Sequence, residues 1–183
     1  MRHQILSPVI GCALLLPGLS SAQQRLVPDL PGRTIVAGIG IRDAGDLETV
    51  WVVGLGVRFP VTQRVNAGLT VWGSDVPELQ CPQEVGFRCP TGGTLTGLDL
   101  GLEFYYGRGL FHPYGVVSVG AGHLSLPDED VRETTFSYST GLGLGARAGR
   151  RTWLFGEGRW RHESFGPYRA HGVVGILGVK WGF

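Results

Sequence analysis

The chain ends in Val179-Lys180-Trp181-Gly182-Phe183, where bulky apolar residues alternate with other residues up to the carboxylate. Successive side chains of a β-strand point to opposite faces, so Val179, Trp181 and Phe183 share one apolar surface. The last residues of a soluble protein usually fray in water, and aromatic side chains are poorly suited to that environment. The alternation therefore predicts a terminal strand with one face in a membrane.

A signal peptide is predicted at the other end of the chain. Residues 1–22 begin with Arg2, contain the apolar run 10–16 and end in small residues, as signal peptides do. An alternative reads Cys12 as the lipidated Cys of a lipoprotein signal, but the apolar run continues past it. We therefore predict cleavage after residue 22, a short periplasmic leader at 23–32 and one domain at 33–183.

The mature chain is balanced in charge, because removal of Arg2 leaves 15 basic and 15 acidic side chains. Nucleic-acid binding requires a clustered basic surplus, so we expect no nucleic-acid partner. After residue 22 no apolar run approaches the roughly 18 residues of a membrane-spanning helix. Entry into a bilayer would then require a closed β-barrel, since only a barrel satisfies the backbone of strands in lipid.

Eight segments with period-2 alternation follow one another, separated by turn residues. They are residues 34–42, 49–59, 64–74, 94–106, 113–124, 135–148, 152–163 and 172–183. An even number of strands brings both termini of the chain to one side of the membrane, the periplasmic side, where the connections 60–63, 107–112 and 149–151 are short. Two connections on the opposite side, 75–93 and 125–134, are longer. Short inner turns with longer outer loops are typical of outer-membrane barrels.

The two faces of these segments differ in chemistry. Apolar residues share one parity and predict the lipid face: Ile35, Ala37, Ile39, Ile41, Trp51, Val53, Leu55, Val57, Phe59, Leu98, Leu100, Leu102, Phe104, Tyr106, Leu142, Leu144 and Ala146. Glycines and charged residues, Arg42 among them, share the other. A charge in so narrow an interior requires a partner, so we predict a lumen plugged by paired charges: Arg58, Asp99, Glu103, Arg147, Glu157, Arg159 and Lys180. A narrow ion path is the alternative. The seventh segment fits imperfectly, because Trp153 and Phe155 share the parity of its charges.

With these features the chain resembles the small outer-membrane β-barrels of Gram-negative bacteria, the family of the outer-membrane protein A-type and X-type domains. The resemblance implies an all-β fold, an eight-stranded antiparallel up-and-down transmembrane β-barrel in the cell outer membrane. It further implies contact with lipid and lipopolysaccharide, and assembly by the barrel-assembly machinery, with Val179, Trp181 and Phe183 as the signal. We expect a monomer without cofactor or metal.

Two cysteines, Cys81 and Cys89, remain after signal cleavage, and both lie in the polar segment 75–93. An exported protein meets an oxidising compartment, so we predict a disulfide between them. A metal site would need two further ligands, and the nearest downstream histidine, His112, lies beyond a whole predicted strand. A pinned loop on a rigid barrel is a plausible binding surface. We therefore expect a structural or surface-interaction role.

Two alternative functions rest on other residues or on another arrangement of the two faces. His123-Leu124-Ser125 faintly resembles the His-x-Ser element of outer-membrane lipid A deacylases, which would make His123 and Ser125 catalytic. The chain departs from that family at Leu126, where an Asn is expected, and at Ser137, where the next strand should supply an acid. The second alternative is a periplasmic lipocalin-like carrier, which would have apolar residues inside and charges outside.

Overall fold

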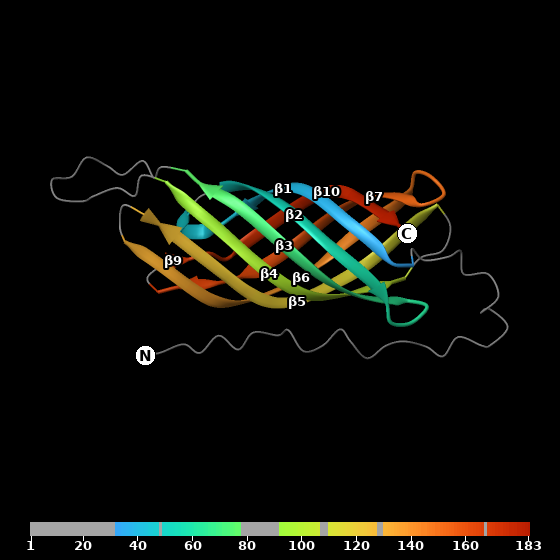
Figure 1. Ribbon diagram of the computed structural model, residues 1–183, viewed down its shortest axis with the longest axis horizontal. Coiled ribbons are helices and arrows are strands. Elements are labelled where there is room, and N and C mark those ends of the chain that lie inside the picture. Colours follow the sequence, from blue (N-terminus) through green and yellow to red (C-terminus); the bar gives the residue numbers. More distant parts are fainter. Residues whose placement is uncertain (1–31, 48, 78–91, 107–109, 128–129, 167) are drawn as a thin grey trace, which may run out of the picture.

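The computed structural model describes residues 32–47, 49–77, 92–106, 110–127, 130–166 and 168–183. Eight long antiparallel strands close into a barrel (Figure 1), which confirms the predicted fold class. The strands are β1 (Thr34–Asp43), β2 (Thr49–Pro60), β3 (Val65–Val76), β4 (Gly93–Tyr105), β5 (Phe111–Leu126), β6 (Val131–Arg147), β7 (Thr152–His162) and β10 (Gly172–Gly182). A short 3-10 helix, η2 (Gly45–Leu47), and a small hairpin of β8 (Ser164–Phe165) and β9 (Tyr168–Arg169) complete the fold.

Neighbouring strands follow the sequence order, and the barrel closes where β10 pairs with β1. The pairing runs from Thr34 opposite Gly182 to Arg42 opposite Val174. The backbone N–H of Phe183 extends it by donating to the carbonyl oxygen of Arg33 at 3.0 Å. The terminal segment is thus the closing strand of the barrel. Among the described residues, no helix has the length and apolar character needed to cross a membrane.

The barrel has two unlike ends. We call the end where β1 begins and β10 finishes the terminal end, and the opposite one, with η2, β8 and β9, the loop end (Figure 1). The predicted long outer connection 125–134 is wrong. Strands β5 and β6 stay paired as far as Leu126 opposite Val131, so residues 125, 126 and 131–134 belong to an extended hairpin. Burial of Leu124 and Leu126 inside the barrel favours the longer strands.

Side chains alternate between an apolar exterior and a mixed interior. The predicted outward positions from Ile35 to Leu144 lie outside, and Trp181 and Phe183 join them with 58% and 63% of their surface exposed. Trp153 and Phe155 point inward with the charges of β7, so the parity of that strand is uniform. Apolar residues outside and charges inside are the reverse of a soluble carrier. The lipocalin-like alternative is therefore wrong.

Apolar side chains close the loop end from within. We name as the loop-end apolar cluster Ala44, Leu47, Val50, Val52, Trp72, Val76, Leu95, Leu124, Leu126, Phe165, Ala170 and Val174. They come from the strand ends, from η2 and from the small hairpin, and most have almost no exposed surface. Their burial excludes water from this end and forms a lid above the charged interior.

Candidate functional site in the barrel interior

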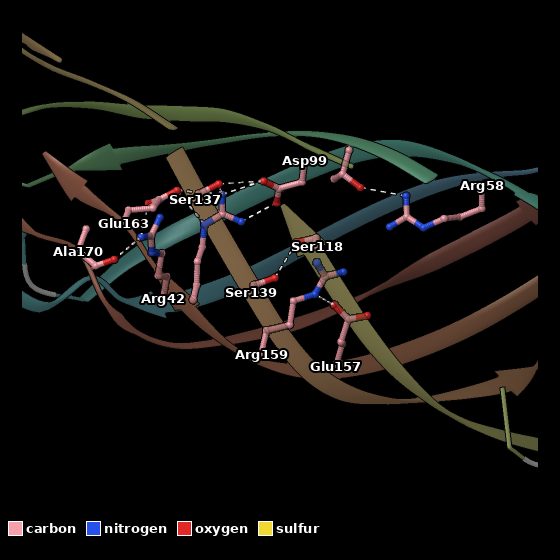
Figure 2. A network of polar contacts seen from close by, with 12 residues as sticks. Arg42, Arg58, Asp99, Ser118, Ser137, Ser139, Glu157, Arg159, Glu163 and Ala170 are labelled. Atoms are coloured by element: carbon pink, nitrogen blue, oxygen red, sulfur yellow. Dashed lines mark hydrogen bonds and ion pairs between the residues drawn. The ribbon is translucent and has the colours of Figure 1, made fainter. Parts of the chain in front are cut away.

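Toward the loop end of the interior, ion pairs link four buried charged side chains. Figure 2 shows Arg42, Glu163 and Asp99 of this group. Arg42 Nη2 contacts Glu163 Oε2 at 2.5 Å, and Arg161 Nη2 contacts Glu163 Oε1 at 2.8 Å. Arg161 also grips Asp99 with both terminal nitrogens, at 2.5 and 2.9 Å. This two-point geometry is the strong form of an arginine–carboxylate contact. We name Arg42, Asp99, Arg161 and Glu163 the loop-side cluster.

Neutral groups fix the orientation of the loop-side cluster. Arg42 donates a second bond to the carbonyl oxygen of Ala170 at 2.9 Å, and Arg161 donates to Ser137 Oγ at the same distance. The guanidinium of Arg161 lies 4.3 Å from the ring centroid of Trp72, and that of Arg42 lies 5.4 Å from it. Such cation–π contacts favour the charged form of a desolvated arginine.

A second group of charges lies toward the terminal end. Glu103 accepts from Arg58 Nε and from Lys180 Nζ, each at 2.8 Å. The Tyr105 hydroxyl donates to Glu103 at 2.7 Å and lies 3.0 Å from Lys180 Nζ. Lys180 also lies 4.2 Å from the ring centroid of Tyr114. Glu103 is therefore shared by two cations, an arrangement that offsets its burial.

Glu157 completes this terminal-side cluster, which we define as Arg58, Glu103, Glu157, Arg159 and Lys180. Glu157 accepts from Arg159 Nε through one oxygen and from the Tyr114 hydroxyl, at 3.0 Å, through the other. Glycines make room for these large side chains: a Cβ at Gly143 would overlap the ring of Tyr114. Alternation of glycine with long charged residues is how a narrow barrel packs its interior.

Between the two clusters lies a cavity of about 70 Å³. Its lining combines charged residues of both clusters and Trp72 with the apolar side chains of Val36, Val52, Phe155, Val174 and Ile176. The interior is thus a packed polar core with one small internal space.

Six of the seven charges predicted for the lumen lie within these clusters, and Arg147 does not. Its side chain is exposed at the terminal end of β6 and bonds to the carbonyl oxygens of Gly149 and Arg150 in the following turn. Its parity is inward, but it is the last residue of β6 and its side chain is exposed at the end of the barrel, so the prediction is wrong for this residue. The predicted network omitted Arg161 and Glu163. Their inward orientation could be predicted from the sequence, since both continue the parity of Glu157 and Arg159.

The proposed catalytic pair lies on the outer face of the hairpin of β5 and β6. His123 is exposed, and its Nδ1 lies 2.9 Å from Thr134 Oγ1. Among the described residues, no carboxylate forms a hydrogen bond with His123. A serine–histidine nucleophile depends on an orienting acid, so this geometry lends the deacylase alternative no support.

His162 stacks on Trp160 with ring centroids 5.8 Å apart. Within the described ranges, no group of three or more His, Cys, Asp or Glu residues could hold a metal ion.

Three predictions fall outside the described residues. They are the signal peptide at 1–22, most of the leader at 23–32 and the disulfide between Cys81 and Cys89. All three remain predictions.

Solved structures share this architecture. The chain is similar to the N-terminal β-barrel domain of Pseudomonas aeruginosa OprF, with 15% identity over 84% of this chain and 98% of that one, at a TM-score of 0.57. It is also similar to Neisserial surface protein A, with 10% identity over 82% of this chain and 96% of that one, at a TM-score of 0.63. No family model and no curated protein sequence matches the chain. The chain has the fold of the small eight-stranded outer-membrane β-barrels.

Proposed function

We propose that this protein is an outer-membrane barrel with a fixed, charge-paired interior that acts as a structural or surface-interaction protein through its loop end. The observation that carries this proposal is the division between an apolar exterior and an interior of buried ion pairs. Such an exterior is stable only in contact with lipid. The fold shared with OprF and Neisserial surface protein A supports the same location.

The interior acts as a plug in this proposal. Each of its four carboxylates, Asp99, Glu103, Glu157 and Glu163, has a cationic partner. The loop-end apolar cluster covers the side that would face the cell exterior. Eight strands enclose just enough space for side chains, so a permanent aqueous channel is not expected.

The loop end offers a concave surface between β2 and β3. These strands pair only from Val53 opposite Gly73 onward, whereas β3 pairs with β4 as far as Val76. The resulting outer groove has a volume of about 520 Å³ and is lined by Thr49, Val50, Trp51, Val53, Gly73, Ser74, Asp75, Pro77, Thr94 and Thr96. Backbone groups along strand edges that do not pair need water or a ligand, which fits a position at or above the headgroups. One of its lining residues, Pro77, belongs to the predicted binding loop 75–93.

Surface labelling tests location and orientation. In a background without native cysteines, Pro127→Cys places a thiol at the loop end and Val61→Cys places one at the terminal end, both at exposed positions. A membrane-impermeant maleimide added to intact cells should label the first variant and leave the second unlabelled until the cells are lysed. Labelling of Val61→Cys but not Pro127→Cys on intact cells would show that the barrel has the opposite orientation. Recovery of the protein in the soluble fraction without detergent would refute the membrane assignment.

Planar-bilayer recording tests the plug. The refolded wild-type barrel should show no sustained conductance. A pore that stays open for seconds would show that the interior charges line a path.

A further inference from the structure

Among the residues that the structure describes, the buried charges of the barrel do not balance. Five cationic side chains lie in the two clusters, namely Arg42, Arg58, Arg159, Arg161 and Lys180. They face four carboxylates, namely Asp99, Glu103, Glu157 and Glu163. An uncompensated charge away from water is costly. One more negative charge would neutralise the interior.

Two residues that line the cavity carry buried donors without acceptors among the described residues. Arg42 is 1% exposed, and only its Nη2 is bonded; its Nε and Nη1 have no hydrogen-bond partner in the described part of the chain. The indole N–H of Trp72 is also buried without an acceptor among those residues. Both residues line the 70 Å³ cavity. Buried donors of this kind call for an acceptor, because each unmade bond costs about 1–3 kcal/mol.

We propose that this cavity binds one small monovalent inorganic anion, chloride under ordinary conditions, with Arg42 and Trp72 as its donors. The anion supplies the missing negative charge and accepts from the free nitrogens. The apolar side chains of Val36, Val52 and Val174 line part of the same cavity. This site is independent of the surface role proposed above, since it requires only the folded barrel.

The chemistry of the cavity favours an anion over its rivals. A cation would meet unpaired donors, and the carboxylates Asp99, Glu103 and Glu157 on the wall are already engaged by arginine, lysine or tyrosine. A water molecule could accept from these donors, but it carries no charge and would leave the excess cation uncompensated. Chloride has no hydrogen to place and brings the missing negative charge. One water requires about 10–15 Å³ by this measure of volume, so a small ion fits and a large organic anion does not.

Bromide provides a direct probe, because its anomalous scattering identifies it against water. Crystals of the refolded barrel grown in sodium bromide should show an anomalous peak in the cavity within hydrogen-bond distance of Arg42. Arg42→Gln should lose this peak, and Arg147→Gln, the same change at an exposed arginine, should retain it. A wild-type cavity without the peak would overturn the proposal. So would an Arg42→Gln cavity that keeps it.

A solution measurement covers the case in which Arg42→Gln does not fold. The wild-type protein is unfolded by urea at constant ionic strength while chloride replaces gluconate, which is too large for the cavity. Above the dissociation constant, the folded-to-unfolded ratio should rise about tenfold for each tenfold increase in chloride. Arg147→Gln should respond in the same way, and Trp72→Phe, which lacks the indole donor, should respond less. Equal stability in chloride and gluconate would contradict the proposed anion site.

Discussion

Arg42 on β1 and Glu163 just beyond β7 form an ion pair of 2.5 Å, although 121 residues separate them in the chain. Their side chains are 1% and 0% exposed. Through Arg161, the same carboxylate is connected to Asp99 on β4. The interior charges therefore link strands that are not neighbours in the sheet, in addition to the backbone ladder.

Removal of one partner from the loop-side cluster should destabilise the barrel. Asp99→Asn leaves the two-point contact of Arg161 without its negative charge, and breaking a buried pair in this way costs about 3 kcal/mol. The free energy of unfolding in urea, measured in lipid vesicles, checks this value. Asp75→Asn, the same change at an exposed position of β3, should cost less than about 0.5 kcal/mol. Equal effects of the two variants would show that the buried pair contributes nothing specific.

Glu103 and Lys180 should behave as one unit in a double-mutant cycle. Glu103→Gln leaves two cations without their shared carboxylate, and Lys180→Met leaves Arg58 as the remaining cationic partner of Glu103. The double variant should be more stable than the sum of the single effects predicts, by about 0.5–3 kcal/mol. Chemical unfolding of all four proteins provides the measurement. Strict additivity would mean that the 2.8 Å contact carries no coupling energy.

Glycines on the inner and outer faces of the barrel should differ sharply in their tolerance of alanine. A methyl group at Gly143 would overlap the ring of Tyr114, whereas one at Gly158 would meet nothing within 4 Å. Overpacking typically costs about 1–3 kcal/mol, so Gly143→Ala should lower the heat-induced unfolding temperature seen by gel mobility. Gly158→Ala should leave that temperature almost unchanged. A lower unfolding temperature for Gly158→Ala than for Gly143→Ala would contradict the packing of Tyr114 against Gly143.

Phe183 should matter more for assembly than for the stability of the finished barrel. Its ring is largely exposed on the outer face, while its backbone N–H bonds to Arg33. Phe183→Ala keeps the backbone bond, so the refolded protein should retain nearly wild-type stability. In cells, the folded fraction in the outer membrane should fall severalfold. Phe136→Ala, another exposed aromatic near the loop end, is the matched control, and normal insertion of Phe183→Ala would refute the signal role.

The disulfide remains a direct biochemical prediction. A thiol reagent applied to the mature protein under denaturing, non-reducing conditions should find no free cysteine, and reduction should release two thiols from Cys81 and Cys89. Two reactive thiols before reduction would show that the loop is not pinned.

Much of the architecture was predictable because strand alternation is a local property. Each segment, such as the one ending at Phe183, shows its own two faces. In a bilayer, eight strands with one lipid-facing side must close into a barrel to satisfy their backbone groups. The ends of the elements were less predictable. Ser125 and Glu133 continue the hairpin of β5 and β6 although their polar composition indicates a loop. Their strands are extended by the buried apolar contacts of Leu124 and Leu126, which lie in the tertiary structure.

The sequence by itself determined the number of strands, the lipid face and the inward parity of the charges, because these depend on the period of a single strand. Only the tertiary structure decided the partners. The tilt and stagger of strands in a closed barrel set which residues meet across the lumen, and no local pattern encodes that offset. The pairs Arg42–Glu163 and Arg161–Asp99 and the exposed position of Arg147 at the end of β6 all follow from it. The excess of one buried cation became visible only when these pairs were in place.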